Sequence, residues 1–165
     1  GGSLRVFGCH ENDLRATAAS VDTLLREEVD RGLQTLSTYS DFQSRADAVK
    51  DGLLTFLLTQ KQEGKNVVAY GAAAKGNTLL NYAGVKPDLL PMVCDAALAK
   101  QGKFMPGSHI PIVRPDRLRE TKPDIVLVLP WNLAQEVADQ HSYIAEWGGR
   151  FAIAVPTVKI LKRKS

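Results

Sequence analysis

The sequence predicts an α/β fold in which a doubly wound, mostly parallel sheet follows an N-terminal helical hairpin. Before Gly64, two long segments carry apolar residues at intervals of three and four, which is the spacing of amphipathic helices. After Gly64, short apolar segments alternate with helical ones, and short connections of this kind favour parallel strands. The segment 125–129 is apolar throughout, as expected for a strand covered on both faces.

Local signals set the bounds of each element. Residues 12–36 and 41–63 are expected to form helices, with Asp41 suited to cap the second helix and Gly64 to end it. Strands are expected at 66–71, 90–95, 110–113, 125–129 and 150–155. Helices are expected at 77–83, 115–121 and 132–146, with Pro115 in a first turn, where its missing N–H costs nothing. The basic run 159–164 is interpreted as a solvated tail.

The chain divides into three predicted regions. Residues 1–10 have a strand-like composition with no turn before them, and we interpret them as the remnant strand of a preceding domain. Residues 11–64 form the helical hairpin, and residues 65–165 form the α/β domain. The chain is therefore expected to be a fragment of a longer protein.

The most informative motif is Gly71-x-Ala73-x-x-Gly76, which lies between a predicted strand and a predicted helix. In nucleotide-binding βαβ units of Rossmann-like folds, such glycines allow a tight turn, and the helix N-terminus receives a phosphate. Asp95 ends the next strand at about the spacing of the acidic residue that contacts a ribose. Alanine replaces the middle glycine, however, and small residues also serve helix–strand packing, so both interpretations remain open.

Ligands of doubly wound sheets bind beyond the carboxyl ends of the strands. This rule selects segments 71–78, 95–109 and 130–132, and the loop 96–109 within the long middle segment is expected to be mobile without ligand. Lys75 would neutralise a phosphate or simply lie exposed, and Asn77 is expected to cap its helix. A lone histidine in a loop, such as His109, is more often structural than catalytic. Trp131 would stack on a ligand or pack against the protein. The candidate binding residues are Gly71, Ala73, Ala74, Lys75, Gly76, Asn77, Thr78, Asp95, Lys100, Gln101, Gly102, His109, Pro130, Trp131 and Asn132.

Composition excludes several classes of protein. The 165 residues carry a net charge of +3, which is too small to indicate nucleic-acid binding. No apolar run approaches the ~18 residues that span a membrane. The two cysteines, Cys9 and Cys94, provide neither a disulfide framework nor a metal site, and a reducing cytoplasm is the expected location. Nucleophile-elbow and P-loop motifs are absent from the sequence, so it indicates a binding site without catalytic residues.

Three longer runs, at 70–82, 100–112 and 129–133, resemble one family. It is the C-terminal domain of the S-adenosylmethionine-dependent nucleotide-sugar C-methyltransferases, which act on dTDP-linked ketosugars. The resemblance covers nearly the whole chain, and residues 1–6 resemble the last strand of that family's central methyltransferase domain. It implies that 71–78 and 95–109 face the nucleotide sugar, with Pro130, Trp131 and Asn132 on the same rim.

The resemblance also implies a division of labour. In such enzymes a base removes a proton beside a ketone, and the resulting enolate attacks the methyl group of the sulfonium. The base, the S-adenosylmethionine site and the zinc site lie in the preceding domains, so this domain is expected to bind no cofactor and to be inactive alone. Its partners would be the nucleotide sugar and the preceding methyltransferase domain. Two alternatives stay open: a stand-alone nucleotide-sugar-binding module, and an NAD-binding oxidoreductase domain.

Overall fold

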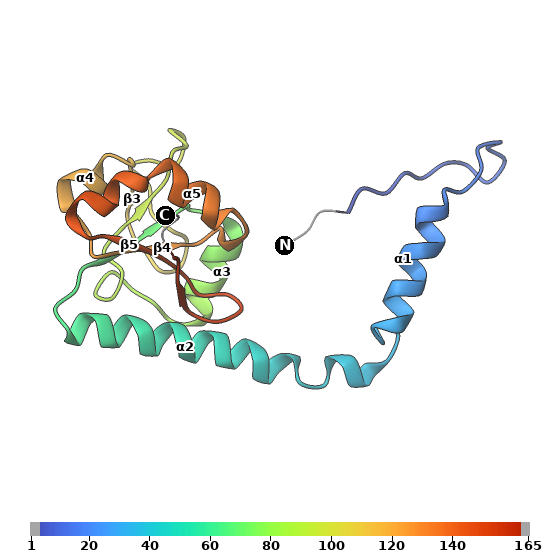
Figure 1. Cartoon of the computed structure of the whole chain (residues 1–165), viewed down its shortest axis with the longest axis horizontal. Coiled ribbons are helices and arrows are strands. Elements are labelled where there is room, and N and C mark those ends of the chain that lie inside the picture. Colours follow the sequence, from blue (N-terminus) through green and yellow to red (C-terminus); the bar gives the residue numbers. More distant parts are fainter. Residues whose placement is uncertain (1–3, 163–165) are drawn as a thin grey trace. The chain divides into compact units, whose positions relative to one another are not determined.

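The structure is a computed structural model that describes residues 4–162 (Figure 1). The chain forms two compact units, residues 1–45 and 46–165. In the first unit, α1 spans Ala19–Asp30 and is followed by the 3-10 turn η1, Leu36–Tyr39. The predicted helix 12–36 is therefore too long, because Gly32 adopts a φ of 68° and ends it. Residues 4–10 have no regular secondary structure, and the remnant-strand interpretation of residues 1–10 stays a prediction.

The second unit alternates strands and helices. The long helix α2, Phe42–Gln62, agrees with the predicted 41–63 and leads into β1, Val67–Tyr70. There follow α3 (Ala74–Tyr82), β2 (Val93–Cys94), β3 (Ile112–Val113), α4 (Arg117–Thr121) and β4 (Ile125–Val128). The chain ends with η2 (Trp131–Leu133), α5 (Ala134–Gln140), η3 (Ser142–Trp147), β5 (Arg150–Ile153) and β6 (Lys159–Ile160). Packing of residues 12–36 against α2 as a hairpin stays a prediction.

The six strands form one sheet in the order β3-β2-β1-β4-β5-β6. Neighbours from β3 to β5 are parallel, and only β6 runs antiparallel to β5. The order reverses between β1 and β4, which is the switch point of a doubly wound sheet. The predicted α/β class is thus confirmed. The interpretation of 159–164 as a solvated tail is wrong for β6, because Lys159 and Ile160 pair with Ile153 and Ala152.

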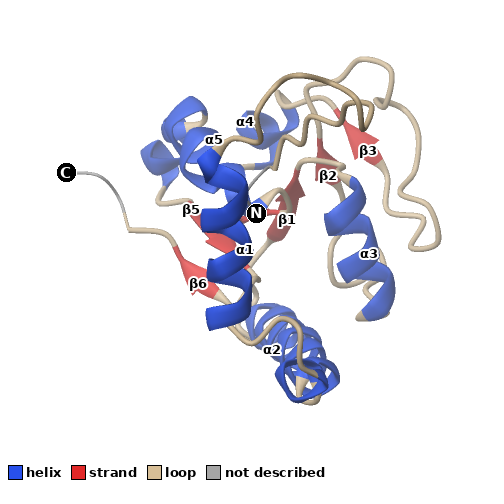
Figure 2. Cartoon of the chain, turned by 90° about the vertical axis from the view of Figure 1, so that its right-hand side faces the viewer, coloured by secondary structure: helices blue, strands red, loops and turns tan. Residues whose placement is uncertain are grey.

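The sheet has helices on both of its faces (Figure 2), and an apolar cluster lies on each side of it. The α3-side cluster receives Val67, Ala69 and Leu127 from the sheet and is covered by α2 and α3, through Leu53, Leu57 and Leu80. The α5-side cluster receives Val68, Val126 and Phe151, and is covered by Leu118 of α4, Val137 of α5 and Ile144 of η3. Alternate residues of β1 and β4 point to opposite faces, so a strand that is buried on both faces has to be apolar throughout.

The described helices include none that is both long enough and apolar enough to cross a membrane. The predicted helix 132–146 is divided into η2, α5 and η3, with α5 ending at Gln140. The predicted strands 90–95 and 110–113 are shortened to two residues each, β2 and β3.

Candidate functional site: the carboxyl edge of the sheet

The first turn of α3 lies directly beyond β1. The helix begins at Ala74, three residues before the predicted start, with Ala73 as the N-cap residue. No side chain caps this end, and its first turn contains no acidic residue. Asn77 lies inside the helix and donates its backbone N–H to Ala73, so the expected capping role of Asn77 is wrong. The N–H groups of the first turn have no partner within a helix, and they carry the positive end of its dipole.

The two glycines of the motif bring the α3 loop against the end of β4. Gly71 has a φ of 91°, and a Cβ added there would lie 2.5 Å from Pro130 Cδ. A Cβ on Gly76 would lie 2.5 Å from Leu129 Cβ. Both positions therefore need glycine for packing, as the alternative interpretation of the motif predicts. The same packing places Pro130 and the residues after it beside the start of α3.

Asp95 ties the loop after β1 to the loop after β2. Its carboxylate accepts hydrogen bonds from the N–H of Ala72 at 2.7 Å, the N–H of Ala97 at 2.8 Å and Nζ of Lys100 at 3.1 Å. Burial disfavours the charged form, but these hydrogen bonds outweigh it and lower the pKa of Asp95. Because a carboxylate offers about four acceptor positions, this one is largely satisfied within the fold. The structure assigns it an anchoring role, and a ribose contact stays a prediction.

Two further predicted residues act with Asp95 in this anchor. Lys100 Nζ also donates to the carbonyl of Ala72 at 2.9 Å. Gln101 Nε2 donates to the Asp95 carbonyl at 2.9 Å. Lys100 and Gln101 are thus already engaged by protein groups, and the loops after β1 and β2 are held in a fixed relation.

The connection between β2 and β3 folds back on itself. Met105 donates its backbone N–H to the Ile110 carbonyl at 2.8 Å, and Ile112 donates its backbone N–H to the Lys103 carbonyl at 2.8 Å. Gly102 adopts a φ of 76°, and its N–H bonds to the Ile112 carbonyl at 2.9 Å. Met105 is buried beside these contacts, and the expected mobility of residues 96–109 stays a prediction. We call residues 103–112 the 103–112 hairpin.

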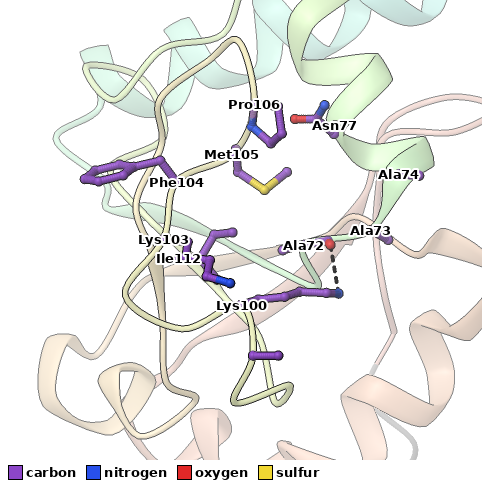
Figure 3. A pocket seen from close by; sticks show the side chains of 11 residues that line it. Ala72, Ala73, Ala74, Asn77, Lys100, Lys103, Phe104, Met105, Pro106 and Ile112 are labelled. Carbon is purple, nitrogen blue, oxygen red and sulfur yellow. Dashed lines mark hydrogen bonds between the residues drawn. The ribbon is translucent and has the colours of Figure 1, made fainter.

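A pocket of about 390 Å³ lies between the start of α3 and the 103–112 hairpin (Figure 3). Four predicted residues line it: Ala73, Ala74, Asn77 and Lys100. The candidate residues did not include the rest of the lining, although all of it except Ile112 lies in the predicted segments 71–78 and 95–109. These residues are Ala72, Ala99, Lys103, Phe104, Met105, Pro106 and Ile112.

Two polar groups of this pocket lack protein partners. Asn77 Oδ1 is buried and has no hydrogen-bond partner among the described residues. Figure 3 shows this oxygen directed from α3 toward Met105 and Pro106 on the opposite wall. Between residues 4 and 162, no hydrogen bond or ion pair involves the ammonium group of Lys103.

A second group of predicted residues lies on the β4 side of α3. Lys75 Nζ donates to Asn132 Oδ1 at 3.0 Å. The same ammonium lies 5.0 Å from the centroid of the Trp131 ring, which is the geometry of a cation–π contact. Lys75, Trp131 and Asn132 therefore form one cluster, which we call the Lys75–Trp131 cluster. Apart from the packing residues Gly71, Gly76 and Pro130 and the anchor formed by Asp95 and Gln101, three predicted residues join neither group. Thr78 bonds to the Ala74 carbonyl, Gly102 turns the loop, and His109 is exposed at a φ of 60°.

Cys94 does not fit a zinc site in this fold. Its thiol is fully buried in β2, and burial raises its pKa to about 12. Among residues 4–162, no group of three or more His, Cys, Asp or Glu side chains is arranged to hold a metal ion. The second cysteine, Cys9, is exposed in the other compact unit.

Two comparisons with known proteins agree on one family. Residues 1–156 match the family described as C-methyltransferase C-terminal domain. The C-methyltransferase NovU of Streptomyces niveus is 33% identical over 165 residues, which is 100% of this chain and 39% of that protein. The chain thus spans about two fifths of the length of this relative. The solved UDP-D-quinovosamine 4-dehydrogenase from Vibrio fischeri aligns at a TM-score of 0.44 and 20% identity, over 59% of this chain and 93% of that chain.

Proposed function

The chain belongs to the family of C-methyltransferase C-terminal domains, and from this premise we propose that it binds the nucleotide sugar of a C-methyltransferase. The substrate would be a ketosugar carried on a nucleoside diphosphate, with dTDP as the expected nucleotide. One observation carries the proposal: the uncapped start of α3 opens at the switch point between β1 and β4. Free N–H groups at such a position bind phosphate oxygens well.

The charges around α3 support an anionic ligand. A helix N-terminus is usually stabilised by an acidic side chain, yet the first turn of α3 has Lys75 instead. A lysine beside the positive end of the dipole is unfavourable until an anion lies between them. Lys103 adds a second ammonium on the opposite side of the helix start, at the pocket. A diphosphate at the start of α3 would be within the field of both.

The role that follows is to hold and orient the substrate. The methyl group would come from S-adenosylmethionine bound in the preceding methyltransferase domain, and zinc would be bound in a domain that also precedes this one in the same longer protein. In this proposal the present domain binds neither and is inactive alone. Its contribution is positional, because fixing the ketosugar relative to the methyl donor removes much of the entropic barrier to their reaction.

The test is a calorimetric titration of this chain with dTDP, UDP, NAD and S-adenosylmethionine in parallel. We expect dTDP or UDP to bind. Lys75→Gln should weaken that binding about tenfold, the loss expected for one charge-assisted hydrogen bond. The glutamine amide can still donate to Asn132, so the fold is retained. Lys61→Gln is the matched control, because within residues 4–162 the Lys61 side chain makes only an exposed ion pair, with Asp88.

Each other outcome has a definite meaning. Preference for NAD would favour the oxidoreductase alternative, and preference for S-adenosylmethionine would assign the methyl donor to this domain. Equal losses in Lys75→Gln and Lys61→Gln would contradict a diphosphate at α3. No binding of any of the four would contradict the proposal that this domain holds the nucleotide sugar by itself.

A further inference from the structure

We infer that the nucleotide sugar crosses the carboxyl edge in one direction, with its pyrimidine base in the pocket beside the 103–112 hairpin and its sugar at the Lys75–Trp131 cluster. The inference rests on the proposed function and adds the polarity of the ligand and the residue that selects the base. The start of α3 lies between the two groups of residues, because Ala73 and Ala74 line the pocket while Lys75 contacts Asn132. A diphosphate at that helix start would therefore have one arm on each side.

The pocket suits a flat, mostly apolar group. Its walls are formed by alanine side chains of the α3 loop on one side and by Met105, Pro106 and Ile112 on the other. A volume of about 390 Å³ lies within the usual range of small-ligand pockets. Figure 3 shows Met105 and Asn77 above this space, with Lys100 below it. A nucleobase has two apolar faces and a polar edge, so it requires polar contacts only at one rim.

Asn77 supplies that polar rim. Its buried Oδ1 accepts no hydrogen bond from the described residues. A buried acceptor without a donor lowers the stability of the folded protein. A carboxamide presents an acceptor and a donor side by side. The imide edge of thymine or uracil presents the complementary pair, a ring N–H beside a carbonyl. Cytosine has no N–H at that ring position, so Asn77 would select the imide bases.

The opposite side suits a sugar better than a base. Trp131 and Asn132 follow the end of β4 and are not buried. Asn132 Oδ1 already accepts a hydrogen bond from Lys75 Nζ at 3.0 Å. Among the described residues, this side therefore has no buried, unsatisfied polar group that would pair with the edge of a base. The partly buried indole of Trp131 can stack on the C–H face of a sugar ring, while Lys75 and Asn132 offer hydrogen-bonding groups to its hydroxyls.

The test compares probes that differ in one part at a time. The affinities of this chain for dTDP, N3-methyl-dTDP, inorganic pyrophosphate and dTDP-glucose are measured by calorimetry. For the unsubstituted chain we expect dTDP to bind at least tenfold more tightly than its N3-methyl form. Asn77→Leu should abolish that preference and leave pyrophosphate binding unchanged, which also shows that the variant is folded. Gln62→Leu, on the exposed end of α2, is the control for adding a leucine.

A second variant tests the direction. Trp131→Ala should weaken dTDP-glucose severalfold and leave dTDP unchanged. If Trp131→Ala weakens both equally while Asn77→Leu keeps the N3-methyl preference, the base lies on the β4 side and the inference is wrong. If dTDP binds but neither variant alters any preference, the inference also fails while the proposed function stands. Failure of every nucleotide probe to bind would instead reject the proposed function.

Discussion

At the scale of single residues, Asp95 is the group on which the candidate site depends most. Sequence spacing marks it as a ligand contact, whereas the structure uses it to join the loops after β1 and β2. Its position at the end of a strand was predictable. Its hydrogen-bond partners, residues 72, 97 and 100, were not, because the first lies 23 positions away in the sequence and no local pattern marks any of them. The packing role of Gly71 and Gly76 was equally hard to predict, because their neighbours Pro130 and Leu129 lie more than fifty positions away in the sequence.

Replacing Asp95 with alanine should lower the free energy of unfolding by about 2 kcal/mol at neutral pH, because two N–H groups and an ammonium lose their acceptor. The pKa of Asp95 is lowered in the fold, so its contribution is present above its ordinary value of 3.8 and is lost as pH falls through the folded pKa. Urea unfolding at several pH values measures this. Asp88→Ala, which removes an exposed ion pair with Lys61, should cost almost nothing.

His141 should make the fold sensitive to mild acid. It is buried against Tyr70, with ring centroids 4.6 Å apart, and Nδ1 lies 3.1 Å from the Tyr143 hydroxyl. Burial lowers the pKa of His141 below its ordinary value of 6.5. The unfolded chain therefore takes up the proton first, and stability falls as pH drops below 6.5 toward the folded pKa.

The variant His141→Phe should flatten that dependence. The measurement is the midpoint of thermal unfolding between neutral pH and about pH 5. His109→Asn is the control, because His109 is exposed and asparagine tolerates its positive φ. An unchanged slope in His141→Phe would contradict the assignment of this acid sensitivity to His141.

At the scale of secondary-structure elements, the sequence predicts some strands and helices better than others. Strands β1 and β4 are four apolar residues each and were expected, whereas β6 is two residues long and carries Lys159. Nothing in a basic segment indicates pairing; β6 forms because β5 offers an open edge. The start of α3 was misplaced for a related reason, since alanines 73 and 74 give no capping signal.

Removing residues 157–165 should destabilise the sheet. Leu161 donates its N–H to the Phe151 carbonyl at 2.8 Å and packs on the α5-side cluster, while Val158 packs on the α3-side cluster. The shortened chain loses these contacts and exposes the β5 edge to other chains. We expect a lower unfolding midpoint and aggregation, measured by thermal unfolding with light scattering. Lys159→Gln should behave as the unsubstituted chain; an equal loss there would assign the effect to charge.

At the scale of the whole molecule, the core belongs to one of the two units. Every buried apolar residue among those described lies at position 53 or beyond. Helix α1 contains no buried residue, although Val21, Leu25 and Val29 form an apolar stripe with intervals of four. Amphipathic spacing therefore predicted a helix correctly without indicating what the helix covers.

A chain limited to residues 46–165 should fold by itself and keep the candidate site. Both apolar clusters and both groups of binding residues lie within it. We expect cooperative thermal unfolding with a midpoint close to that of the full chain, and the same affinity for dTDP. Loss of cooperative unfolding in the shorter chain, or an affinity at least tenfold weaker, would show that residues 1–45 contribute to the fold or to the site.

The sequence by itself determined the α/β class, the parallel core strands, the position of the candidate site at their carboxyl ends and the family resemblance. These features depend on local periodicity and on short motifs, which are written along the chain. Only the tertiary structure decided that Asp95 anchors two loops, that β6 closes the sheet, and that Asn77 faces a pocket across from Met105. Each of these depends on atoms that are distant in sequence and meet only when the sheet brings them together.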